Sequence, residues 1–184
     1  MQEVAAARLA RPRAFAPAGP VPAPPPGYTW EGLMDMALGE ARTALAQGDV
    51  PVGALIVAAD GHILARAANA VEQRHDPTAH AEVLAIREAC ARLGNWRLSG
   101  CVLVATLEPC AMCAAAIAHA RLAGVVFGAA DEAAGAVISR AEYLDGPACA
   151  TPVWHMGGVR AEACADLLRQ CFAGRRCGAA RQAG

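Results

Sequence analysis

The spacing of apolar positions divides the chain into helices and strands. A helical spacing predicts a first helix over residues 29–47, with Thr29 able to cap it and Gly48 ending it. Its apolar face would consist of Leu33, Met34, Ala37, Ala41, Ala44 and Leu45. Two apolar runs, 52–59 and 62–67, are joined by Asp60-Gly61, a pair that favours a tight turn. They predict a β-hairpin.

The second half of the pattern alternates between helices and strands. Asp76-Pro77 predicts the start of a second helix, with Asp76 as N-cap and Pro77 in the first turn. Its buried stripe would be Val83, Ile86, Cys90 and Leu93. After it we expect, in order, a strand at 102–106, a helix from Pro109 to about Arg121, a strand at 125–128 and a last helix at 161–172. This order predicts an α/β protein with a mixed sheet covered by helices.

The two ends of the chain differ from this pattern. Residues 1–27 are rich in Ala, Pro and Arg and lack bulky apolar residues, so we expect a disordered extension. We expect one domain at 28–176 and a flexible tail at 177–184. The extension has no continuous apolar core of the kind found in signal peptides, and no apolar run approaches the roughly 18 residues of a membrane span. We therefore expect a cytoplasmic protein without membrane contact.

Charge and cysteine content restrict the possible partners. The formal net charge is −1, so no global positive field attracts nucleic acid, and RNA binding would need a local patch. Every basic residue is Arg, which suits phosphate and stacking contacts better than Lys. Of eight cysteines, two form a metal-type pair. We expect the other six to be reduced thiols that are mostly buried.

Four residues in two short motifs carry the predicted chemistry. Cys110 and Cys113 are three positions apart, so on a helix they share one face, and a helix N-terminus favours thiolates. His80 precedes a helix in the same way. Two helix N-termini that each follow a strand can converge on one ion, which predicts a Zn²⁺ site of one imidazole and two thiolates.

Three protein ligands are one short of a closed structural zinc site, which is typical of catalytic zinc. Glu82 lies two residues after His80, close enough to reach a water molecule at such a site without being a ligand. We therefore predict that Glu82 is the catalytic residue that transfers protons. A lone Cys-x-x-Cys could also belong to a zinc ribbon or a redox pair, but the second pair that a ribbon requires is absent.

From about Tyr28 to Phe127 the chain resembles the bacterial tRNA-specific adenosine deaminases, which convert wobble adenosine to inosine. The resemblance lies in four stretches, at 50–54, 74–82, 106–113 and 125–129. It implies a three-layer α/β/α cytidine-deaminase-like fold with a mixed central sheet of about five strands. It also implies one zinc ion per subunit, a homodimer, and a tRNA anticodon stem-loop as substrate.

The resemblance also assigns residues that bind the substrate. Asn69 matches an asparagine that hydrogen-bonds the flipped base, Ala81 lies inside the His-x-Glu motif, and Asp131 matches an aspartate near the loop backbone. Phe172, Arg175 and Arg176 match a C-terminal segment of an aromatic residue and arginines that touches RNA. Between residues 136 and 156 the chain departs from the family, which usually shows a Gly-Ser pair and later an Asn-His pair there.

Two other functions remain open. A guanine or cytosine-type deaminase that acts on a free base or nucleoside would share the stretch 76–82, whereas residues 106–108 and the Arg-rich C-terminus favour tRNA. A non-catalytic zinc-binding RNA module is the second alternative. Glu82 argues against it, because a structural zinc site needs no base beside the metal.

Overall fold

The computed structural model describes residues 22–147 and 149–181, with side chains through residue 173. Its centre is a five-stranded sheet of order β2-β1-β3-β4-β5. The strands are β1 (Gly53–Val57), β2 (Ile63–Ala68), β3 (Val102–Leu107), β4 (Gly124–Ala129) and β5 (Trp154–Met156). β1 pairs antiparallel with β2 and β3, and β3, β4 and β5 run parallel. The predicted mixed sheet and the hairpin are confirmed.

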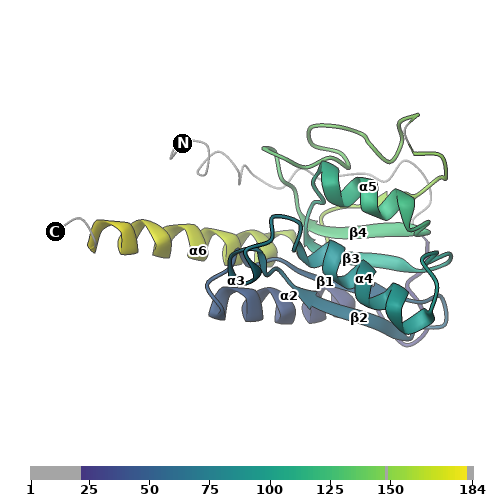
Figure 1. Cartoon of the computed structure of the whole chain (residues 1–184), viewed down its shortest axis with the longest axis horizontal. Helices are drawn as coiled ribbons and strands as arrows, with labels where there is room; N and C mark the ends of the chain where they lie inside the picture. Colours follow the sequence, from purple (N-terminus) through teal and green to yellow (C-terminus); the bar gives the residue numbers. More distant parts are fainter. Residues whose placement is uncertain (1–21, 148, 182–184) are drawn as a thin grey trace.

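Helices cover both faces of this sheet (Figure 1). They are α2 (Trp30–Ala46), α3 (Val71–Arg74), α4 (Ala81–Leu93), α5 (Ala111–His119) and α6 (Ala161–Arg181). Alternate residues of β1 show the layering. Ala54 and Ile56 pack with α4 and α5, whereas Leu55 and Val57 pack with α2 and α6. The fold is therefore the three-layer α/β/α arrangement that the sequence predicted.

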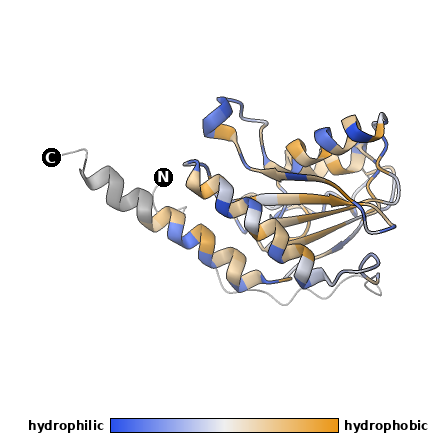
Figure 2. Ribbon diagram, turned by 90° about the horizontal axis from the view of Figure 1, so that it is seen from below, coloured by the Kyte–Doolittle hydropathy of each residue, from blue (hydrophilic) through white to orange (hydrophobic). Residues whose placement is uncertain are grey.

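Hydropathy follows the same layers (Figure 2), with apolar residues along the strands and polar residues on the outer sides of the helices. Thr29 caps α2 as predicted, its hydroxyl accepting a hydrogen bond from the Gly32 N–H at 3.0 Å. No helix in the described part of the chain is both long and apolar enough to cross a membrane.

The second predicted helix begins later than its sequence indicated. The Asp76 carboxylate accepts hydrogen bonds from the backbone N–H and the hydroxyl of Thr78, at 2.8 and 2.7 Å, and so closes a turn instead of capping a helix. α4 begins at Ala81 with His80 as its N-cap. The predicted buried position of Leu93 is also wrong, because this last residue of α4 is 47% exposed.

Other elements differ in extent or were not predicted. α3 and β5 were both missed, and α5 is shorter than predicted, because Arg121 adopts a left-handed conformation with φ of 59°. α6 continues to Arg181, beyond the predicted end at Phe172. Short elements such as β5 depend on tertiary packing. Trp154 in β5, for example, lies edge-on against Trp30 of α2, with ring centroids 5.7 Å apart.

The described part of the N-terminal segment packs on the domain. Pro25 is buried, and the Trp30 indole N–H donates to the Pro22 carbonyl at 3.2 Å. The predicted boundary at residues 27 and 28 therefore falls inside a packed segment. The prediction of disorder for residues 1–21 lies outside the described residues.

Candidate metal centre and its pocket

Two helix N-termini bring the predicted metal ligands together. His80 is the N-cap of α4 and Cys110 the N-cap of α5, and neither side chain hydrogen-bonds to the N–H groups of its own helix. Both side chains are thus available to the site instead of capping. α4 and α5 pack against each other on one face of the sheet (Figure 1), so their first turns lie side by side. Cys113, in the first turn of α5, faces the same point.

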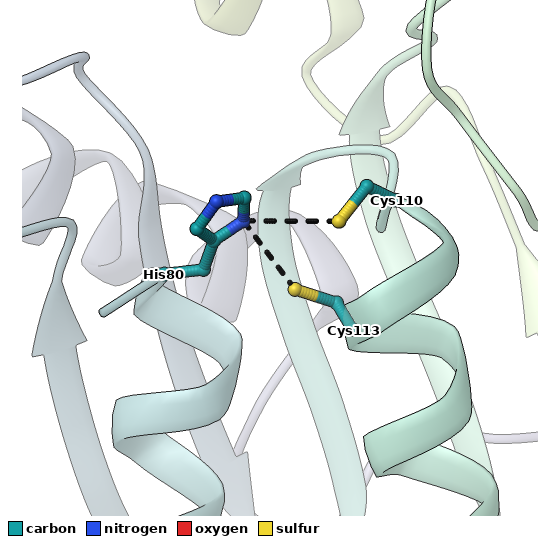
Figure 3. A group of neighbouring side chains, drawn as sticks. All are labelled: His80, Cys110 and Cys113. Carbon is teal, nitrogen blue, oxygen red and sulfur yellow. Dashed lines mark hydrogen bonds between the residues drawn. The ribbon is translucent and has the colours of Figure 1, made fainter. Parts of the chain in front are cut away.

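The ligand atoms have the spacing that a tetrahedral zinc ion requires (Figure 3). His80 Nδ1 lies 3.8 Å from Cys110 Sγ and 3.5 Å from Cys113 Sγ, and all three atoms lie within 4.8 Å of one another. Zinc bonds of about 2.0–2.3 Å to nitrogen and sulfur give tetrahedral edges of roughly 3.5–3.8 Å. The three side chains therefore fit one zinc ion and leave one tetrahedral position open.

The electrostatics of this cluster favour a thiolate. The pKa of Cys110 is lowered to about 4, chiefly because the Cys113 thiol donates a hydrogen bond to it, and further because His80 lies beside it. The pKa of Cys113 is raised because its proton is held by Cys110 and because it is buried. The pKa of His80 is raised, mainly by its hydrogen bond with Cys110. The lowered pKa favours the deprotonated form of Cys110, which is the form in which a cysteine binds zinc.

Glu82 lies next to this cluster in an unusual setting. Its side chain is only 3% exposed, and burial raises the pKa of its carboxyl. Oε2 is buried and has no hydrogen-bond partner among the described residues. A buried carboxylate oxygen without a partner costs stability, so its presence points to a role in binding or proton transfer.

A cavity of about 260 Å³ opens beside these residues. Its lining includes His80, Glu82 and Cys110, and it brings in three of the predicted substrate-binding residues: Asn69, Asp131 and Phe172. Asn69 and Asp131 are buried, with 6% and 7% of their surfaces exposed. Residues far apart in the sequence therefore meet around one space.

Three other predicted substrate-binding residues are placed differently. Ala81 is fully buried in the core and is not among the residues that line the cavity. Arg175 and Arg176 belong to the part of α6 for which only the backbone is described. Whether these three contact the substrate stays a prediction.

Two buried acids at the site were missed by the sequence reasoning. Asp49 lines the cavity and is 1% exposed. Glu108 also lines it and accepts backbone hydrogen bonds from Asp131, Val137, Ile138 and Ser139, as well as one from the Ser139 hydroxyl. Glu108 lies within one of the stretches that carry the resemblance. Its position in the sequence, however, does not indicate whether its carboxylate is buried or exposed to solvent.

Comparison with known proteins identifies the family. The profile of the cytidine and deoxycytidylate deaminase zinc-binding region matches residues 29–129. The chain belongs to this family. It is accordingly a zinc-dependent deaminase, and the His80, Cys110 and Cys113 cluster supplies the expected ligand set.

The relatives of this chain include tRNA-specific adenosine deaminases and a guanine deaminase. A tRNA-specific adenosine deaminase of Agrobacterium fabrum is 43% identical over 144 residues, covering 78% of this chain and 94% of the relative. A solved structure from a study of A-to-I editing by tRNA:A34 deaminases at the wobble position is 43% identical, with a TM-score of 0.72, covering 74% of this chain and 98% of its own. A solved guanine deaminase structure from Nitrosomonas europaea is 26% identical, with a TM-score of 0.66, covering 87% of this chain and 90% of its own.

Proposed function

We propose that this protein converts adenosine to inosine at the wobble position of a tRNA anticodon, by hydrolytic deamination. The chemistry rests on one observation: Glu82 lines a cavity beside the three side chains that fit a zinc ion, and its buried Oε2 has no hydrogen-bond partner among the described residues. The choice of substrate is supported by a tRNA-specific adenosine deaminase that is 43% identical to this chain, with 94% of the relative covered.

His80, Cys110 and Cys113 would hold the zinc ion, which when bound would act as a Lewis acid and make water nucleophilic near neutral pH. Glu82 Oε2 takes the proton of the attacking water and delivers it to the purine ring nitrogen N1. Glu82 then takes the remaining proton of that water, from the hydroxyl now at C6, and transfers it to the departing amine. The C6–N bond breaks, oxygen takes its place at C6, and the products are inosine and ammonia.

The remaining cavity residues would hold the base. Asn69 would hydrogen-bond its edge, Asp131 would lie near the loop backbone, and Phe172 would offer an aromatic ring from the cavity lining. The anticodon loop is already single-stranded, so turning one base into the cavity costs little pairing energy. We propose an anticodon stem-loop as the minimal partner and a homodimer as the assembly, both from the family resemblance.

Deamination of free guanine is the second candidate, supported by the likeness to the Nitrosomonas europaea enzyme. The two functions are separated by one experiment on purified, zinc-loaded protein. It is incubated with an anticodon stem-loop that has adenosine at the wobble position, and separately with free guanine and free cytosine. Inosine in the stem-loop, read by primer extension and mass spectrometry, supports the proposal. Rapid release of ammonia from guanine with an unchanged stem-loop would replace it with the guanine-deaminase function.

A further inference from the structure

Asp49 is a buried acid with an unusual set of partners. It lies between α2 and β1, lines the cavity and is 1% exposed. Its Oδ1 accepts hydrogen bonds from Asn69 Nδ2 at 3.1 Å and from the Glu72 N–H at 3.0 Å, and its Oδ2 accepts one from the Gln73 N–H at 3.2 Å. Among the described residues, no Arg or His forms an ion pair with it. Its partners are therefore amide donors, and one of them is the residue assigned to the base.

The Asp49 carboxylate accepts a hydrogen bond from the amide nitrogen of Asn69, which bears on how that amide is oriented. A primary amide has an accepting oxygen and a donating nitrogen of nearly the same shape, and it can rotate to exchange them. An ionised carboxylate only accepts, so it binds the Nδ2 side of Asn69 and repels Oδ1. One Nδ2 hydrogen is used by Asp49, and the other hydrogen and Oδ1 remain for the cavity. The base edge that Asn69 can recognise is thereby fixed.

The backbone of Asn69 is held as well. Its N–H donates to the Val52 carbonyl at 2.9 Å, next to β1. Three and four residues later, the N–H groups of Glu72 and Gln73 in α3 donate to the same Asp49 carboxylate that holds the Asn69 side chain. Asp49 thus joins the side chain of Asn69 to the segment that follows it, and both Val71 and Glu72 lie on the wall of the cavity.

We infer that Asp49 is a positioning residue that presents Asn69 to the nucleobase in one amide orientation, and so sets which edge of the base is accepted. This inference rests on the proposed function only in that Asn69 contacts the base. A purely structural alternative is that Asp49 serves α3 alone, by satisfying its first N–H groups. The two roles differ in whether the effect of Asp49 passes through Asn69.

A double-mutant cycle separates these roles. The variants are Asp49→Asn, Asn69→Ala and the two together, with kcat/KM measured on the wobble-adenosine stem-loop and zinc content measured for each. Asp49→Asn keeps the size of the side chain but removes the preference for one amide orientation. We expect it to lower kcat/KM on the order of 10- to 100-fold, the effect of a lost hydrogen bond to a charged group. In the Asn69→Ala background the same change should cost less than about threefold.

Asp60→Asn is the matched control. Asp60 also accepts a backbone hydrogen bond, from His62 at 3.0 Å, but it stands exposed in the β1–β2 turn away from the cavity. Its loss should leave kcat/KM unchanged. If Asp49→Asn lowers zinc content, Asp49→Ser, which keeps one accepting oxygen, is put through the same cycle.

Equal losses from Asp49→Asn with and without Asn69 would overturn the inference and assign Asp49 to α3. A wild-type protein that leaves the stem-loop unchanged would instead overturn the proposed function. In that case the cycle is measured on the free base that the wild type does deaminate, and the same non-additivity decides the role of Asp49.

Discussion

Glu82 holds an oxygen that no other described group satisfies, at the first turn of a helix where the chain could have placed an apolar residue. Buried polar atoms are almost always paired, and an unpaired one costs about 1–3 kcal/mol. The N-caps His80 and Cys110 show the same pattern, because neither caps its helix. Three residues of the site thus give up local stability in favour of chemistry.

The stability cost of burying the Glu82 carboxylate gives a prediction for Glu82→Gln. The variant should keep about one zinc per chain and lose activity by about 10²–10⁴-fold, because an amide cannot transfer the proton. Its melting temperature should be equal to or above that of the wild type, since a neutral amide costs less to bury than a carboxylate. Zinc is measured by atomic absorption and stability by calorimetry. Cys113→Ala is the control and should lose most of its zinc. A zinc-loaded Glu82→Gln protein with a near-normal rate would remove Glu82 from the mechanism.

The residues that sequence could find are those whose spacing is itself the signal. His80, Glu82, Cys110 and Cys113 sit in short motifs whose ligand chemistry is specific. Asp49 has no such motif. Its importance comes from Asn69 and α3, which lie 20 or more residues along the chain and approach it only in the folded protein.

At the scale of elements, one loop depends on a single buried carboxylate. Residues 131–139 fold around Glu108, which accepts five hydrogen bonds from them. The loop passes so closely that a Cβ at Gly135 would overlap the Glu108 carboxylate and come within 2.6 Å of the Asp131 carbonyl oxygen. This loop includes the start of the segment that departs from the family, so Glu108 holds the start of that segment in place.

Gly135→Ala should therefore destabilise the protein by about 1–3 kcal/mol, the usual cost of overpacking. At about 2–4 °C per kcal/mol for a chain of this size, the melting temperature should fall by roughly 2–12 °C. Gly39→Ala is the matched control, because Gly39 is exposed within α2 and its added Cβ would meet nothing within 4 Å. That variant should be stabilised by about 0.5–1 kcal/mol. Equal melting temperatures for the two would show that the loop yields without cost.

Element types were predictable from periodicity, whereas their ends were not. α2 and the hairpin carry long patterns with clear turn signals, and they were found with bounds close to those observed. α4 was placed too early because Asp76 can close a turn as well as cap a helix, and only contacts decide between them. β5 has three residues, and its pairing with β4 is a tertiary interaction that no local pattern reveals.

At the scale of the whole molecule, the N-terminal segment belongs partly to the domain. Deleting residues 1–21 removes none of the described contacts and should leave the melting temperature unchanged. Deleting residues 1–26 also removes the Trp30–Pro22 hydrogen bond and the buried Pro25. We expect this longer deletion to cost about 1–2 kcal/mol, or roughly 2–8 °C by calorimetry. Zinc content is the control and should be equal in both. Identical melting temperatures would show that residues 22–26 contribute nothing.

RNA binding must arise from few charges, because the chain has a net charge of −1. Arg175 and Arg176 follow Phe172 by three and four positions in the sequence, and the family resemblance matches all three with a segment that touches RNA. Replacing both with Ala should weaken stem-loop binding. It should also make the negative slope of log K against log salt shallower by roughly 1.4, since each phosphate contact to a single strand contributes about 0.7. Zinc content should not change.

Arg92→Ala with Arg97→Ala, at the opposite end of α4 from His80, is the matched control and should leave the slope as in the wild type. Binding is measured by fluorescence anisotropy between about 50 and 200 mM salt. An unchanged slope in the Arg175 and Arg176 double variant would show that other residues carry the phosphate contacts, and would remove this segment from the proposed RNA interface.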